Sequence, residues 1–249
     1  MRVFFSLLGS EILKLRRTLA LWMIVLGPFA VVMLQAFLWL NSKKVVGNDP
    51  DLWLAFATNI LSIWSLFMYP LVCALVVALV YHYEHTTAGW QKLYTFPVAK
   101  WKILASKMAG SLLLVSASFI ILIILSMAGA FLVDVLHPDI ELPRDIPIAA
   151  VAERSLFVFA STLSVFAIQN FVSWRWTSLA VPIGIGIAGT FMALFASSWK
   201  YGYLFPWIMG VHALFQTPGK FETSLWGGFI GGVVIVIATV VYSSRRDIV

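Results

Sequence analysis

The sequence predicts an all-α polytopic membrane protein with six transmembrane helices, preceded by an N-terminal amphipathic helix at the membrane interface. Hydrophobic residues make up 61% of the chain and charged residues only 11%. A soluble domain averages about 25% charged residues, because its surface faces water. A helix needs about 20 mainly apolar residues to cross a bilayer, and six segments qualify: roughly 19–40, 56–80, 109–133, 150–172, 178–196 and 225–243. We expect residues 1–249 to form a single transmembrane domain.

Residues 1–17 precede the first span and have the pattern of an amphipathic helix. Polar and apolar side chains each recur at helical spacing: Ser6, Ser10, Lys14 and Arg17, and beside them Phe4, Leu8, Ile12 and Leu15. A helix of this kind lies in the membrane interface, and its candidate interfacial residues are Glu11, Lys14, Arg16 and Arg17. The alternative is a helix that lengthens the first span inward.

The second segment that does not span, residues 81–108, is polar although long apolar runs flank it. Pro97 divides it, because proline lacks an N–H and disfavours helix in the residue before it. We expect a short helix over 82–95, with Thr86 or Thr87 as a possible cap. After Pro97, the stretch VAKWKILASK reads as a second amphipathic helix. A connection that only joined two spans could be much shorter, so we expect this loop to dock on a partner.

Two features of the later chain depart from plain spans. The fifth span is short and contains Pro182, where we expect a break in the helix. Residues 197–224 have an apolar run too short to cross, with Pro206 and Trp207 at its centre. A solvated loop would be more polar, so we expect this segment to enter the outer leaflet and return.

Glycines recur at close spacing in the fifth and sixth spans. GIGIAG has the letters of the dinucleotide-binding G-x-G-x-x-G motif, but that motif needs a preceding strand and a water-exposed site. GGFIGG contains two overlapping G-x-x-x-G pairs, which are typical of close helix contacts. We therefore expect helix packing, within the bundle or between subunits, at Gly184, Gly186, Gly189, Gly227, Gly228, Gly231 and Gly232.

The basic residues predict the orientation in the membrane. Cytoplasmic loops carry an excess of Lys and Arg. With both termini in the cytoplasm, eleven of the 17 basic residues lie on the inner side and six on the outer side. The net charge of +6 is then a topology signal, and we expect no nucleic-acid partner.

No catalytic or metal-binding constellation is evident. His82, Glu84 and His85 lie together, but no further His or Cys is near them, and Cys73 is alone, so we expect no metal site and no internal disulfide. The chain has no phosphate-binding loop and no protease or lipase motif. The spans also lack Asp, Glu or Arg at mid-depth, the usual mark of an ion relay. Energy for uphill transport would therefore enter from another chain.

Three stretches carry a resemblance to a known family: SEILKLRRT at 10–18, EHTTAGWQKLYTFPVAKWKILASK at 84–107 and YLFPWIMG at 203–210. They resemble signatures of the membrane subunits of ATP-binding-cassette exporters in the type-two permease superfamily. Within it, the chain is similar to the lantibiotic-immunity and bacitracin-resistance permeases. Trp90 departs from the pattern, since Thr is common there.

The resemblance implies a function and partners. The helix from Glu84 to Leu93 would couple the spans to a separate ATPase subunit. The implied coupling-loop residues are Glu84, Thr87, Gly89, Trp90, Lys92, Leu93, Pro97, Lys100 and Lys107. Two ATPase subunits, carrying ATP and Mg, and a second permease, identical or homologous, would complete the transporter. The chain itself would be no enzyme and would carry no cofactor. It would export an amphipathic or antimicrobial peptide, or another hydrophobic compound, across the bacterial cytoplasmic membrane.

Two other classes of function remain open from sequence. A secondary transporter would show internal inverted repeats and ionisable or broken-helix sites within its spans, and no convincing repeat relates residues 1–133 to 134–249. A non-transporting membrane scaffold could use the same docking loop, and the sequence does not exclude it.

Overall fold

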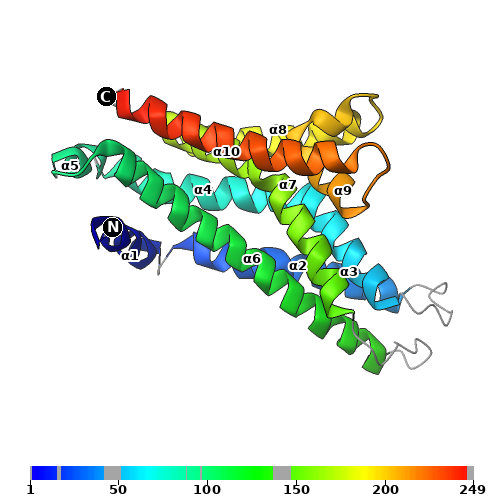
Figure 1. The fold of residues 1–249 in the computed structure, drawn as a ribbon. Coiled ribbons are helices and arrows are strands. Elements are labelled where there is room, and N and C mark those ends of the chain that lie inside the picture. The colour runs from blue at the N-terminus through cyan, green and yellow to red at the C-terminus, as the bar shows by residue number, and fades with distance from the viewer. Residues whose placement is uncertain are drawn as a thin grey trace.

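The computed structural model is a bundle of long helices (Figure 1). It describes residues 2–15, 18–41, 52–87, 89–95, 97–136 and 147–245, and that part of the chain contains no strand. Its elements are α1 (Arg2–Leu15), α2 (Leu19–Leu40), α3 (Leu52–Ile63), the π-helix η1 (Trp64–Met68), α4 (Tyr69–Thr86), α5 (Gly89–Thr95), α6 (Lys100–Leu136), α7 (Ile148–Arg175), α8 (Ala180–Ser197), the 3-10 helix η2 (Gly202–Leu204), α9 (Pro206–Leu214) and α10 (Phe221–Arg245).

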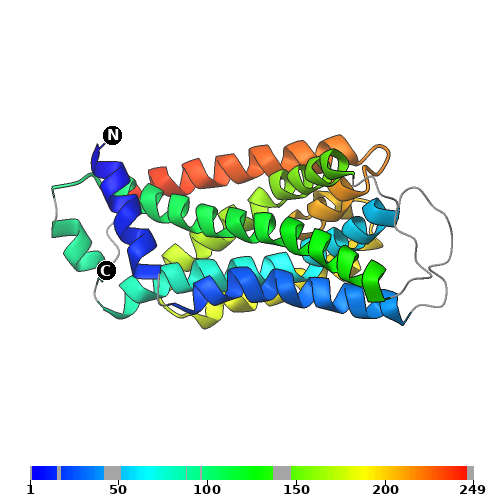
Figure 2. The same ribbon diagram turned by 90° about the horizontal axis from the view of Figure 1, so that it is seen from below.

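The six predicted spans are confirmed. Six helices are long and apolar enough to cross a membrane: Leu19–Leu40, Leu52–Thr86, Lys100–Leu136, Ile148–Arg175, Ala180–Ser197 and Phe221–Arg245. The helices α1 and α5 and the C-terminal end of α10 gather at one end of the bundle (Figure 1). Figure 2 shows α1 lying across the direction of the spans at that end.

The second span is interrupted by a π-helix that the sequence analysis did not predict. α3, η1 and α4 follow one another without a gap, and Pro70 lies in the first turn of α4. Because Pro70 has no N–H, one helical hydrogen bond is missing at this point, and the wider turn accommodates the loss. Trp64 is fully buried there, with its ring 5.8 Å from that of Phe119 on α6.

Three local expectations were wrong. Pro182 does not break the fifth span, because α8 begins at Ala180 and Pro182 lies in its first turn, where proline is tolerated. Residues 82–95 are not one helix: α4 runs on to Thr86 as part of the span, Thr87 ends it, and α5 starts anew at Gly89. The stretch after Pro97 is not a separate helix either, since α6 is continuous for 37 residues from Lys100.

α7 lies at the centre of the bundle and packs against α4, α9 and α10. Glycines permit the closest of these contacts. A Cβ on Gly228 would collide with the Ser161 carbonyl of α7, and one on Gly232 would lie 2.7 Å from the Leu163 carbonyl carbon. A Cβ on Gly231, on the other side of α10, would meet nothing within 4 Å.

The segment 197–224 is folded against the bundle. α9 begins at Pro206, packs on α7 and α10, and buries Trp207. A Cβ on Gly189 would collide with the Trp207 ring, and one on Gly186 would lie 2.6 Å from the Ala74 Cβ, whereas Gly184 faces open space. How deeply α9 enters the membrane stays a prediction.

Candidate functional site

A group of buried charged residues lies where α1, α4 and α6 meet, at the end of the bundle that also holds α5. Glu11 of α1 is 5% exposed, Glu84 of α4 is 2% exposed and Lys107 of α6 is 1% exposed. α1 packs on α6 beside Gly110, where an added Cβ would lie 3.7 Å from the Cβ of Glu11, in ordinary van der Waals contact. With Lys14, these residues form what we call the charge cluster.

Each lysine of the charge cluster bridges both carboxylates. The Lys107 ammonium donates to Oε2 of Glu11 at 2.7 Å and to Oε1 of Glu84 at 3.0 Å. The Lys14 ammonium donates to Oε1 of Glu84 at 2.8 Å and to Oε1 of Glu11 at 3.1 Å. Two positive and two negative charges therefore cancel, which is the condition for keeping ions away from water.

Lys14 is the member of the charge cluster nearest to solvent, with its side chain 34% exposed. Burial lowers the pKa of Lys14, but its hydrogen bond to Glu84 and the negative charge of Glu11 raise the pKa more, so that it lies above the ordinary value of 10.5. Lys14 therefore stays charged at neutral pH and holds α1 to α4.

α5 is attached to the charge cluster through its first two residues. A Cβ on Gly89 would collide with Oε2 of Glu84, so only glycine allows this approach. Trp90 is 5% exposed, the Lys107 ammonium lies 5.8 Å from its ring centroid, and its ring stacks on Tyr81 at 6.2 Å. The contact with Lys107 is a cation–π interaction.

A chain of hydrogen bonds links α5 to α7 through α4. Nε1 of Trp90 donates to Nδ1 of His85 at 3.2 Å, and Nε2 of His85 lies 3.0 Å from the carbonyl oxygen of Ser173. The Tyr81 hydroxyl beneath Trp90 donates to Oδ1 of Asn170 at 3.1 Å. Sequence reasoning missed this link, because residues nearly 90 positions apart show no shared pattern.

A comparison with the sequence profiles of protein families shows the family of this chain. The sequence profile of the ABC-2 family transporter proteins matches residues 7–193, from α1 to α8. The chain belongs to the ABC-2 transporter family. It is a membrane-spanning permease subunit of an ABC transporter, a transport component that is not itself catalytic. No curated protein sequence matches the chain.

In the permease, α5 has two faces. Gly89 and Trp90 are buried and Leu93 is half-buried, so this face lies against the bundle. The opposite face carries Gln91 and Lys92, both exposed. A short helix with one side anchored and the other free can present a surface to another protein.

The remaining predicted site residues lie apart from the charge cluster or at its margin. Thr87 is exposed and donates to the carbonyl of Tyr83 at 2.7 Å. Pro97 is exposed before α6, and Lys100 is half-buried at its start. Arg16 and Arg17 lie outside the described residues. Within the residues that the structure describes, no three His, Cys, Asp or Glu side chains gather to hold a metal ion.

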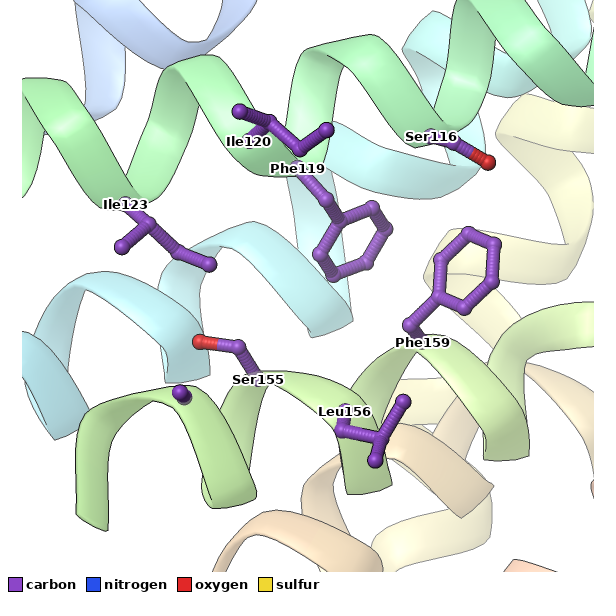
Figure 3. A pocket seen from close by; sticks show the side chains of 8 residues that line it. Ser116, Phe119, Ile120, Ile123, Ser155, Leu156 and Phe159 are labelled. Atoms are coloured by element: carbon purple, nitrogen blue, oxygen red, sulfur yellow. The ribbon is translucent and has the colours of Figure 1, made fainter. Parts of the chain in front are cut away.

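The permease also has an apolar cavity between α6 and α7, with a volume of about 230 Å³, which is open at the surface of the bundle, where Ile120 and Leu156 are exposed. Figure 3 shows the Phe119 ring of α6 and the Phe159 ring of α7 pointing towards each other at its edge, with centroids 5.2 Å apart. The Ser155 hydroxyl donates to the Val151 carbonyl of its own helix, which leaves it no second proton to donate to a ligand. A hydrocarbon group can lie against this apolar lining.

Proposed function

We propose that the permease exports an amphipathic or hydrophobic compound, such as an antimicrobial peptide, with energy from a separate ATPase subunit that docks on α5. The observation that carries this proposal is the construction of α5, which is fixed to two spans, α4 and α6, by buried contacts and has an exposed outer face. A short helix laid into a groove of a partner is a common mode of recognition.

The rigid attachment of α5 is what coupling needs. A displacement of α5 moves Gly89 and Trp90, which contact Glu84 of α4 and Lys107 of α6, and through His85 it acts on α7. Interior contacts transmit such shifts because cores are densely packed. ATP and Mg would be bound by the partner, in two ATPase copies, and a second permease, identical or homologous, would complete the assembly.

The orientation follows from charge. The loop that contains α5 and both termini lie on the cytoplasmic side of the bacterial cytoplasmic membrane in this proposal, because that side then holds most of the Lys and Arg residues. The apolar cavity between α6 and α7 fits the hydrocarbon part of the cargo.

The proposal is tested by reversing one exposed charge on α5. We expect Lys92→Glu to abolish co-purification of an ATPase subunit in mild detergent, and with it ATP-driven clearance of an amphipathic peptide from vesicles. Lys200→Glu, an equal charge reversal at the exposed opposite end of the bundle, is the matched control and keeps both. A partner that binds the wild type without any ATP-driven clearance would favour the scaffold function instead.

A further inference from the structure

His85 lies between two groups whose hydrogen-bonding roles are fixed by their chemistry. The indole N–H of Trp90 can only donate, so Nδ1 of His85, 3.2 Å away, must accept and carry no proton. The carbonyl oxygen of Ser173 can only accept, so Nε2 of His85, at 3.0 Å, must carry the proton. The geometry therefore assigns one tautomer, the neutral imidazole protonated at Nε2.

A second proton would turn the acceptor Nδ1 into a donor that faces the Trp90 N–H. Trp90 is 5% exposed, so its N–H would lose the hydrogen bond to His85 and meet little water in exchange. The positive charge would also be added where the Lys107 ammonium already lies against the Trp90 ring.

The charged and titratable groups around His85 do not offset that charge. His82 is on the same helix, and Glu84 beside it already accepts hydrogen bonds from Lys107 of α6 and Lys14 of α1. Glu11 of α1 is engaged by the same two lysines. From α7, His85 meets an uncharged group, the Ser173 carbonyl.

We propose that His85 is a proton-sensitive positioning residue: its neutral form holds Trp90 of α5 to α4, which is itself bonded to α7, and proton uptake at Nδ1 releases Trp90. Histidine is the side chain whose ordinary titration falls between about pH 5 and pH 8. Acidification then loosens the attachment of α5 and lowers the efficiency of coupling. The regulatory consequence rests on the proposed role of α5, whereas the release of Trp90 does not.

The release of Trp90 is measured on the purified full-length permease in lipid nanodiscs, without any partner. The protein is labelled with 5-fluorotryptophan, and the ¹⁹F resonance of Trp90 is identified from its absence in Trp90→Phe. We expect this resonance to shift between about pH 8 and pH 5 in the wild type. His85→Gln supplies one acceptor and one donor but does not titrate, so its Trp90 resonance stays constant. His82→Gln, the matched control on the same helix, keeps the shift.

A Trp90 resonance that does not move with pH, or that moves equally in His85→Gln, overturns the proposal. The ¹⁵N-histidine spectrum of the wild type reads the tautomer directly, so the test does not depend on a variant that folds. In the assembled transporter, we expect the ratio of transport to ATP hydrolysis to fall on acidification in the wild type and to stay constant in His85→Gln. A constant ratio in both, with the ¹⁹F shift present, refutes the regulatory part. Absence of any ATPase partner, with the shift present, refutes the proposed function alone.

Discussion

Replacing Lys107 by Met should destabilise the permease far more than replacing Lys14 by Met, although each lysine bridges the same two carboxylates. Lys107 is 1% exposed, and its removal leaves Glu11 and Glu84 with a single cation between them. Removing one partner of a buried ion pair costs about 3–5 kcal/mol, because the remaining charge stays away from water. The side chain of Lys14 is 34% exposed, so water replaces it in part, and the expected loss is about 1 kcal/mol.

The measurement is reversible unfolding of the purified protein in mixed micelles, followed by far-UV circular dichroism. The double variant Glu84→Gln/Lys107→Met removes one charge of each sign, so the cluster is neutral again with Glu11 and Lys14. We expect the double variant to lose less stability than the sum of its single variants, by about 1–3 kcal/mol. Equal losses for Lys107→Met and Lys14→Met, or strict additivity in the double variant, would refute the argument that burial decides the energetics.

Two further substitutions test the attachment of α5 and the apolar cavity. Gly89→Ala places a Cβ against the Glu84 carboxylate and should lower the rate of ATP-driven transport at least about tenfold, which corresponds to a barrier increase of about 1.4 kcal/mol. Gly231→Ala, where a Cβ meets nothing within 4 Å, should leave this rate unchanged. Ala152→Phe fills the cavity between α6 and α7 and should lower clearance of a hydrophobic cargo several-fold while the ATPase still binds. Val234→Phe, at an exposed position on α10 away from the cavity, is its control, and equal effects from both would exclude the cavity as a binding site.

The spans could be predicted from sequence because their signal is local. A run of about 20 apolar residues can cross the hydrocarbon core whatever the neighbouring helices are. The span predicted over residues 19–40 therefore coincides with the observed helix, Leu19–Leu40. The start of the third span could not be found in this way. The stretch after Pro97 is amphipathic and the span is apolar, yet nothing between them breaks a helix, and α6 continues through both.

The members of the charge cluster could be predicted as site residues from sequence, but their contact with one another could not. Glu84 and Lys107 were predicted as parts of a docking loop and Glu11 and Lys14 as parts of an interfacial helix, and no spacing relates the two groups. Their pairing depends on how α1 packs on α6, which is a tertiary contact. His85 was considered as a metal ligand because of its neighbours in sequence, whereas the structure pairs it with Trp90 and Ser173.

α5 is attached to the charge cluster through Gly89 and Trp90, and to His85 through Trp90. These two attachments respond differently to protons. The raised pKa of Lys14 means that its contribution to stability is complete below its ordinary value of 10.5 and is lost only as pH rises through the higher folded value. Lys14 therefore keeps its charge as the pH falls below neutral. His85 of α4 is the group that, in the proposal above, takes up a proton on acidification. In the proposal, moderate acidification therefore leaves the charge of Lys14 between α1 and α4 in place and releases Trp90 of α5 from His85 of α4, which separates loss of coupling from loss of fold.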